Sequence, residues 1–148
     1  MEGLMHRLTA AIAGLSSLAF AIGAQAASPV QGDWITQSAS GKVRVAPCGD
    51  RLCGTIVWLK NPIDKTTGQP QKDANNPDPS LRTRPVVGLL LIKDFKAARD
   101  GRWTGGTIYD PESGKTYASK IALNPDGSLK VEGCIAIICQ AQTWKRAP

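Results

Sequence analysis

The segment from Trp103 to Tyr117 constrains the fold of this chain more than any other. Residues 103, 105, 107 and 109 would lie on one face of an extended strand, and residues 104, 106 and 108 on the other. Asp110–Gly114 (Asp-Pro-Glu-Ser-Gly) supplies turn residues, and the chain then returns in a second strand. The adjacent Gly105 and Gly106 predict that the first arm is bent or bulged. We therefore predict a β-hairpin, and we take it as the middle hairpin of an antiparallel barrel.

Other short apolar or alternating segments complete this pattern, and Asn124–Gly127 (Asn-Pro-Asp-Gly) provides a further turn. Leu52–Leu59 and Val86–Ile92 are apolar on both faces, which is typical of strands covered on both sides. Asp94–Gly101 has room for a single helical turn, and no long amphipathic helix is evident. The sequence predicts an all-β fold: a small antiparallel up-and-down β-barrel of about eight strands. The remaining predicted strands are Trp34–Thr36, Lys42–Ala46, Ser128–Cys134 and Cys139–Arg146.

The N-terminal segment has the pattern of a secretory signal peptide. A short basic start, His6-Arg7, precedes the apolar run Leu8–Ala24, and Ala24-Gln25-Ala26 matches a small-x-small cleavage site. We predict a signal peptide over residues 1–26, a single domain over residues 27–148, and a periplasmic or secreted protein without a membrane span. The net charge of +6 favours an anionic envelope component as a partner, and export argues against nucleic acid.

The numbers and positions of histidine and cysteine limit the kinds of catalytic and metal site that the mature chain can form. The single histidine leaves with the signal peptide, which excludes Ser-His-Asp and Cys-His catalysis and histidine metal sites in the mature chain. We expect no enzyme, no catalytic residue, no metal and no cofactor. The four cysteines form two equally spaced pairs, and in an oxidising compartment we expect two local disulfides, Cys48–Cys53 and Cys134–Cys139. A zinc site built from all four thiolates is the alternative.

The long segment Asn61–Pro85 is rich in proline and carries polar residues of two kinds. An oxygen-rich cluster could hold Ca²⁺ or could form turns that pin the loop; it comprises Asp73, Asn75, Asn76 and Asp78. Arg82 and Arg84 could bind an anionic head group or could pair with Asp73 and Asp78 and fasten the loop. The acidic pair Asp110 and Glu112 is interpreted as part of a turn.

Several strings along the mature chain resemble a known family. Gly32-x-Trp34 and Trp144-x-Arg146 resemble the lipocalin (calycin) superfamily, in which a basic residue from the last strand meets the tryptophan of the first. Over nearly its whole length, the mature chain resembles the bacterial secreted family called domain of unknown function 2147 (DUF2147). That resemblance implies a small exported protein with a lipocalin-like barrel and no assigned activity. The matching strings are Leu52–Leu59, Asp73–Asp78, Leu81–Pro85, Gly88-Leu89, Trp103–Pro111, Gly114–Tyr117 and Gln142–Arg146.

These observations predict a binding protein. We expect Gly32, Trp34, Trp144 and Arg146 to close one end of the barrel, where a guanidinium can stack on an indole ring. The interior either forms a cavity for a small apolar or amphipathic molecule or is solidly packed, in which case the loops would contact envelope components. The apolar Ile135–Ile138 tip folds over the barrel mouth, extends the strands or forms a contact patch. The candidate ligand-binding residues are Arg82, Arg84, Leu89, Leu91, Trp58, Trp103, Tyr109 and Tyr117.

Overall fold

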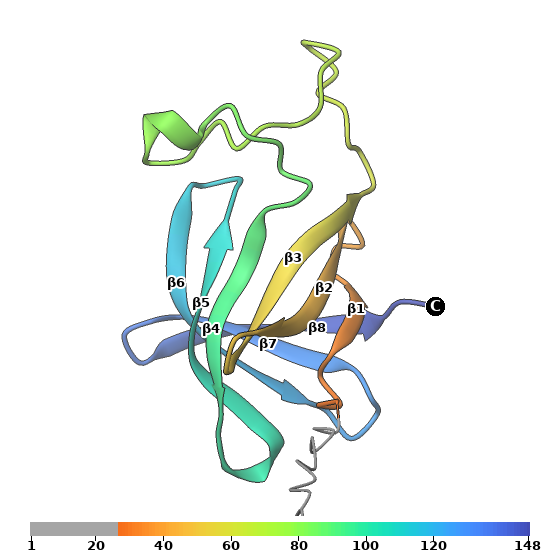
Figure 1. Ribbon diagram of the computed structural model, residues 1–148, viewed down its shortest axis with the longest axis vertical. Helices are drawn as coiled ribbons and strands as arrows, with labels where there is room; N and C mark the ends of the chain where they lie inside the picture. Colours follow the sequence, from red (N-terminus) through yellow and green to blue (C-terminus); the bar gives the residue numbers. More distant parts are fainter. Residues whose placement is uncertain (1–26) are drawn as a thin grey trace, which may run out of the picture.

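Eight antiparallel strands follow one another in sequence order around a closed barrel, and β1 pairs with β8 to complete it (Figure 1). The structure is a computed structural model and describes residues 27–148. The predicted signal peptide over residues 1–26 lies outside the described residues. The all-β prediction, with about eight strands in an up-and-down barrel, is confirmed. The strands are β1 (Gly32–Ile35), β2 (Gly41–Cys48), β3 (Arg51–Leu59), β4 (Leu90–Ala97), β5 (Arg102–Asp110), β6 (Lys115–Leu123), β7 (Leu129–Ile135) and β8 (Ile138–Arg146).

Helical structure in the described residues is limited to two short 3-10 turns, η1 (Pro79–Leu81) and η2 (Arg99–Gly101). η2 lies in the segment for which the sequence indicated a helical turn. No helix in residues 27–148 has the length and apolar character needed to span a bilayer.

The prediction of a strand over Val86–Ile92 is wrong for the first half of this segment. Val86–Leu89 forms a turn in which the Leu89 amide donates to the Val86 carbonyl, and β4 begins only at Leu90. Gly88 has φ 99°, a left-handed conformation that interrupts a strand. Apolar composition alone did not reveal this turn, because Val86 and Leu89 are buried in the core just as strand residues would be.

The bulge predicted from Gly105 and Gly106 is present in β5. Trp103 pairs with Ile121 of β6, but the next pair is Gly106 with Ser119, so β5 contains one extra residue. Gly105 has φ 72° at this point. Trp103 therefore lies on the same face as Gly106, and the predicted division of β5 into two continuous faces is wrong.

A second bulge changes the faces of β3. Lys42 pairs with Trp58 and Val43 pairs with Ile56, so Val57 is the extra residue. As a result, Ile56 and Leu59 line the interior, whereas Trp58 is 44% exposed. The expectation that both faces of this strand are covered is wrong for Trp58.

Most of the apolar core fills the barrel end opposite the long Lys60–Leu89 loop, and Val86 and Leu89 at the end of the loop also belong to this core. Two glycines allow strands and side chains to approach closely there: a Cβ on Gly54 would lie 2.5 Å from Ile92, and a Cβ on Gly106 would lie 2.5 Å from the Phe95 ring. The most completely buried large side chains are Trp34, Trp144, Phe95, Leu52, Ile92, Ile121 and Leu129.

Trp34 and Arg146 close this end, in the arrangement expected from the sequence. The Trp34 indole is fully buried and donates to the Val30 carbonyl at 2.9 Å. The Arg146 guanidinium lies 4.2 Å from the centre of the indole ring and donates to the carbonyls of Gln31 and Pro29. Gly32 leaves room for this arginine, because a Cβ there would lie 2.7 Å from Nη1. Trp144 is buried in the same core.

We expect Arg146→Ala to lower the free energy of unfolding by about 1–2 kcal/mol, since it removes a cation–π contact and two hydrogen bonds. Urea denaturation followed by circular dichroism measures this change. Lys145→Ala, the neighbouring exposed cation, serves as the control and should change stability by less than about 0.5 kcal/mol. Equal midpoints for the two variants would contradict closure of the barrel by Arg146.

Both predicted disulfides are confirmed. Cys134 and Cys139 lie directly opposite each other on β7 and β8, and Cys48–Cys53 joins β2 to β3. The alternative zinc site has no thiolates left among the described residues, because no cysteine there is free. Each bridge closes a short loop, so we attribute to each about 2 kcal/mol of stabilisation in the chain-entropy model.

Candidate functional site: an open cavity in the barrel

The barrel end beneath the long loop is hollow. A cavity of about 1010 Å³ occupies it, at the upper limit of the volumes usual for small-molecule sites. Five of the side chains that line it also belong to the core: Val43, Ile56, Val131 and Trp144 form its floor, and Val86 of the long loop is the fifth. The core that closes the opposite end of the barrel therefore forms an apolar base for this cavity.

Two glutamines of β8 bring polar groups into the interior. Gln142 lies opposite the buried Val131, and Gln140 lies opposite Gly133, so both side chains share the inner face of the sheet. Both glutamines are nevertheless exposed, which means that solvent reaches the interior at this part of the sheet. The Gln142 carbonyl accepts a hydrogen bond of 2.9 Å from the Trp144 indole, so its amide group faces the cavity with two donors.

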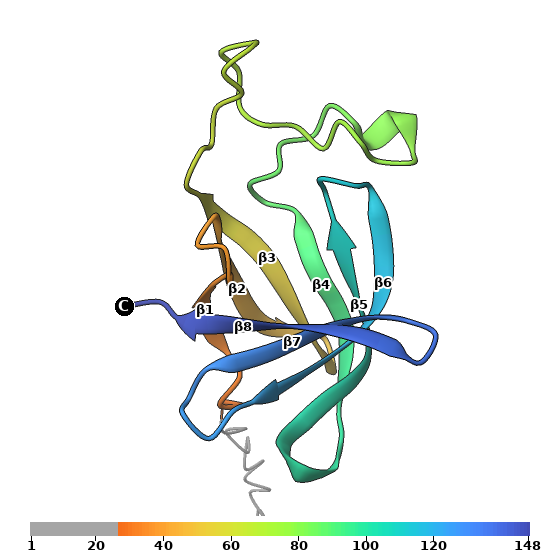
Figure 2. The ribbon, with the colours of Figure 1, turned by 180° about the vertical axis from the view of Figure 1, so that it is seen from behind.

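The cavity opens toward the side on which β7 and β8 cross the barrel. Figure 2 shows these two strands running across the lower part of the molecule, below the long loop and the tips of β5 and β6. β1 is short and pairs with β8 only at Trp34–Arg146 and Ile35–Lys145. The β1–β2 turn and the first half of β8 both line the cavity but do not pair with each other, which leaves a wide mouth.

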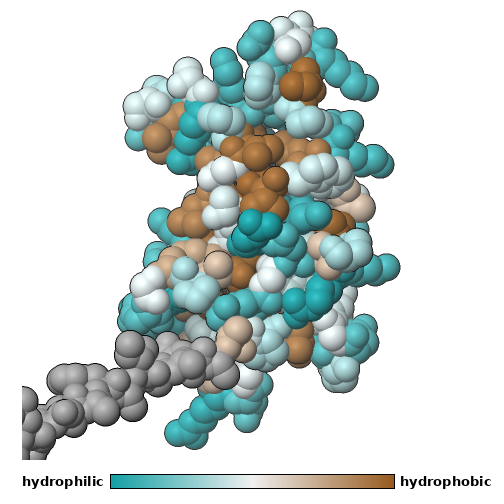
Figure 3. All heavy atoms as spheres, turned by 45° about the vertical axis from the view of Figure 1, so that its right-hand side comes forward, coloured by the Kyte–Doolittle hydropathy of each residue, from teal (hydrophilic) through white to brown (hydrophobic). Residues whose placement is uncertain are grey.

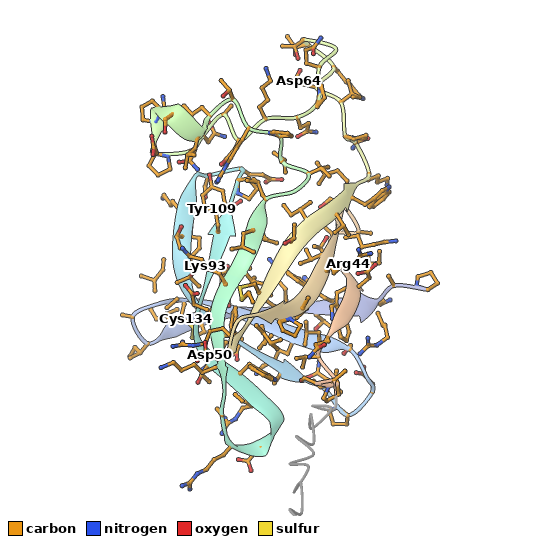
Figure 4. The ribbon with its side chains drawn as sticks, in the orientation of Figure 1. Arg44, Asp50, Asp64, Lys93, Tyr109 and Cys134 are labelled. Carbon is orange, nitrogen blue, oxygen red and sulfur yellow. A yellow bond between two sulfur atoms is a disulfide. The ribbon has the colours of Figure 1, made fainter. Side chains whose placement is uncertain are left out.

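A buried carboxylate fastens the long loop above this mouth. Asp73 is fully buried and accepts hydrogen bonds from the Tyr109 hydroxyl, the Asn76 amide and the Arg84 guanidinium. Arg84 approaches through Nε and Nη2, at 3.0 and 2.9 Å from the same oxygen. Tyr109 lies at the loop end of β5 (Figure 4), so the cluster joins the loop to the barrel wall.

The titration behaviour of this cluster follows from its contacts. Burial alone would raise the pKa of Asp73, but the hydrogen bonds from Tyr109, Asn76 and Arg84 outweigh it and hold the pKa below its ordinary value. Burial and the hydrogen bond to the Asp73 carboxylate raise the pKa of Tyr109 to about 12. At neutral pH the cluster therefore contains an ionised Asp73 and a protonated Tyr109.

A second attachment holds the same loop to the β5–β6 turn. The Asn75 amide donates to the Glu112 carbonyl at 2.7 Å. Gly114 passes so close to the Asn75 backbone that a Cβ at this position would overlap the Asn75 carbonyl oxygen, and its φ is 70°. The loop is therefore a fixed part of the cavity rim.

The candidate ligand-binding residues separate into two groups in the structure. Leu91, Tyr109 and Tyr117 line the cavity. The other five do not, and their positions have specific causes: Leu89 and Trp103 pack in or against the core, Trp58 is turned outward by the β3 bulge, and Arg82 and Arg84 bind within the loop.

Of the two functions weighed for the arginines, the geometry supports fastening of the loop. Arg84 forms an ion pair with Asp73, as expected, whereas Arg82 donates to the Asn76 carbonyl at 2.7 Å. Lys72 is instead a cation that lines the cavity, together with the acidic Asp110 at the end of β5 and Glu112 in the β5–β6 turn. In the sequence, the only indication that Lys72 lies at the cavity was its position next to Asp73.

The oxygen-rich loop cluster is occupied by internal hydrogen bonds. Asn76 Oδ1 accepts from the Asp78 amide, and Asp78 Oδ1 accepts from the amide and hydroxyl of Ser80. These are turns that pin the chain. Within residues 27–148 no three His, Cys, Asp or Glu side chains are grouped so as to hold a metal ion.

Comparison with known proteins agrees with this geometry. Residues 32–146 match the family described as "Uncharacterized protein conserved in bacteria (DUF2147)". The chain belongs to the DUF2147 family. A similar solved structure is protein HP1028 from the human pathogen Helicobacter pylori, described as belonging to the lipocalin family. It aligns with a TM-score of 0.68 and 24% identity, over 80% of this chain and 83% of that one, which shows a lipocalin-like fold. No curated protein matches this DUF2147 chain.

Proposed function

We propose that this protein binds a small amphipathic molecule in the barrel cavity and acts outside the cytoplasm. The observation that carries the proposal is the cavity of about 1010 Å³, with its apolar floor and its polar mouth. An apolar tail would lie against Ile56, Val131 and Trp144, since burial of apolar surface is the main driving force for such binding. A polar head would reach Gln140, Gln142 or Lys72 near the mouth.

The fixed loop supports this proposal on energetic grounds. Binding is weakened when a loop must become ordered around the ligand, and here hydrogen bonds to Tyr109 and Glu112 already hold the loop in place. The two disulfides agree with an oxidising compartment. Binding rather than catalysis is proposed because the sequence after Ala26 contains no histidine, and because the Tyr109 hydroxyl, which donates to the Asp73 carboxylate, serves to attach the loop to the barrel wall.

The test is displacement of a fluorescent fatty acid from the unaltered protein and from a variant with a filled cavity. Gln140→Trp introduces a large side chain on the inner face of β8, and we expect it to weaken binding by about tenfold or more, because it removes ligand volume. Thr143→Trp is the matched control: it adds the same side chain to the same strand, on the outer face. It should leave the affinity unchanged.

The outcomes separate the alternatives. If the unaltered protein binds no fatty acid or other amphiphile, the binding proposal fails, and the interpretation that the protein acts through its loops gains. Equal affinities for Gln140→Trp and Thr143→Trp would place the ligand outside the cavity. Circular dichroism of both variants confirms that the fold is retained.

A further inference from the structure

One edge of β8 lies beside the cavity mouth without a neighbouring strand. β7 pairs with β8 from Ile138 to Trp144, but on the other edge β1 pairs only with Lys145 and Arg146. Among residues 27–148, no strand pairs with that edge between Ile138 and Trp144. In Figure 2, β7 follows the lower side of β8, and the opposite side faces the space below the long loop. The first half of β8 is therefore an open sheet edge.

The backbone groups of this edge point away from β7. The Thr143 amide donates at 2.8 Å to the side chain of Gln37 in the β1–β2 turn, which fixes its direction. Because the hydrogen-bonding direction alternates along an antiparallel strand, the amides and carbonyls of Cys139 and Ala141 point the same way. Within the described part of the chain, no backbone group bonds to these two residues from that side. Gln37 thus takes the place of a missing strand at Thr143 alone.

This edge lacks the features with which soluble proteins protect an exposed strand. Charged residues, prolines and bulges are the usual ones. From Gly133 to Trp144 the sequence contains no charged residue and no proline. The register of β7 and β8 is continuous, so no bulge twists the edge away. An edge unprotected in this way can accept another strand.

The edge is also rigid before any partner arrives. Of the alternatives for the Ile135–Ile138 tip, extension of the strands is observed, since Ile135 pairs with Ile138 across a two-residue turn. The Cys134–Cys139 disulfide lies directly behind this pair. A strand that is already ordered loses little conformational entropy when it binds a partner.

We propose that the open edge of β8 binds an extended peptide segment by strand addition. The amides and carbonyls of Cys139 and Ala141 would pair with a peptide backbone, which offers donors and acceptors in the same alternation. Ile138, Gln140 and Gln142 line the cavity on the inner face of β8. Alternate side chains of the added strand would therefore point into the cavity mouth, and the others would point to solvent. The segment that fits best alternates apolar and polar residues.

A second copy of this chain is a less suitable partner than a separate peptide. In each copy, Gln37 and β1 already cover the edge from Thr143 onward, so two barrels could pair only over the short stretch before it. Each copy also carries a net charge of +6, and like charges oppose association. A single extended strand brings neither a second β1 nor this charge.

The probe is a fluorescein-labelled, amidated peptide with the sequence of residues 126–133, Asp-Gly-Ser-Leu-Lys-Val-Glu-Gly. This sequence forms a strand in the barrel itself, and it alternates apolar with charged side chains. Fluorescence anisotropy should show that it binds the unaltered protein. In nuclear magnetic resonance spectra, the amides of Cys139 and Ala141 should shift and exchange more slowly with solvent. The Gln140 amide, which faces β7, should gain no protection.

Two substitutions at one position test the edge. Ala141→Pro removes a donor from the open edge and spares the pairing with β7, so it should weaken peptide binding by about tenfold. Ala141→Val adds a side chain of similar size but keeps the amide, and it should leave the affinity unchanged. Circular dichroism checks that both variants are folded.

A further control addresses apolar adhesion elsewhere. Figure 3 shows that apolar surface also lies below the long loop on another face of the molecule. Leu90, at the start of β4, is 45% exposed and lies outside the core cluster. Leu90→Ser reduces the exposed apolar surface of the barrel, and it should not change peptide binding.

N-methylated forms of the peptide test strand pairing without altering the protein. Residues of an added strand that bond to Cys139 and Ala141 share the outer face with those two side chains. When leucine and valine of the peptide enter the mouth, these bonded residues are its lysine and its glutamate. Methylation of the lysine and glutamate amides should therefore abolish binding, whereas methylation of the leucine and valine amides should preserve it.

Three results would overturn the proposal. The first is no change at the Cys139 and Ala141 amides with millimolar peptide. The second is equal affinity of Ala141→Pro and Ala141→Val together with equal binding of the two methylated peptides. The third is a dimer in sedimentation velocity in which the Ala141 amide is already protected, since the edge would then belong to a second copy. Failure of the small-molecule site is seen separately, because fatty-acid displacement reports on the cavity and amide exchange reports on the edge.

Discussion

Asp73→Ala should lower the free energy of unfolding by about 3 kcal/mol, because it removes one partner of a buried ion pair. The Asp73 side chain has no exposed surface, and three side chains donate to it. Without the carboxylate, the Arg84 guanidinium and the Tyr109 hydroxyl lose their acceptor in a partly buried place. Urea denaturation measures the global effect, and limited proteolysis of the Lys60–Leu89 loop measures its release from the barrel.

Asp50→Ala is the control for this prediction. Its side chain is 88% exposed, so the change in unfolding free energy should be below about 0.5 kcal/mol. Should Asp73→Ala match Asp50→Ala in both urea midpoint and protease resistance, the proposed fastening of the loop by Asp73 is wrong.

The lowered pKa of Asp73 adds a pH dependence with a defined sign. A carboxyl group whose pKa is lower in the folded state stabilises the fold above its unfolded pKa of about 3.9. This stabilisation is lost as the pH falls through the folded value. The stability difference between the unaltered protein and Asp73→Ala should therefore be constant near neutral pH and decrease in acid below about pH 4.

Trp34→Ala should destabilise the protein by about 4 kcal/mol, the cost usual for removing a large buried aromatic side chain. The substitution leaves a cavity at the closed end of the barrel, and it also removes the hydrogen bond to Val30 and the ring beneath Arg146. Thermal and urea unfolding followed by far-ultraviolet circular dichroism avoid any dependence on tryptophan fluorescence.

Trp58→Ala is the matched comparison for Trp34→Ala. The same residue type is removed from β3, where the side chain is 44% exposed, and we expect a loss of about 1 kcal/mol or less. Comparing the two variants also tests whether the bulge at Val57 is present. A large loss in Trp58→Ala would mean that this ring faces the interior, contrary to the register of β2 and β3.

The sequence predicted the barrel well because each short strand carries its own alternation and its own turn residues. The hairpin from Trp103 to Tyr117, the two disulfides and the contact between Trp34 and Arg146 all follow from local patterns or from closure of the chain ends. Side-chain faces were harder to predict. An extra residue at Val57 or Gly105 reverses the side-chain faces beyond it. The glycine pair at Gly105 predicted its bulge, whereas no residue type at Val57 indicates the bulge in β3.

The cavity was predicted only in part, for a similar reason. Tyr109, Tyr117 and Leu91 line it, as expected from their apolar or aromatic character. Gln140 and Gln142 were missed, although they alternate with Trp144 on β8, because glutamine in a strand ordinarily indicates the solvent face. In a hollow barrel the inner face is also wet, so polarity alone does not distinguish inside from outside.

The solid end of this barrel stabilises the fold, whereas the hollow end surrounds the cavity. This separation affects which positions of the sequence can change during evolution. Substitutions at Trp34, Phe95 or Ile121 are constrained by folding. Gln140 contributes little buried area, so it can be exchanged with a small effect on stability. One frame of strands could thereby acquire a different ligand through a few substitutions around the mouth.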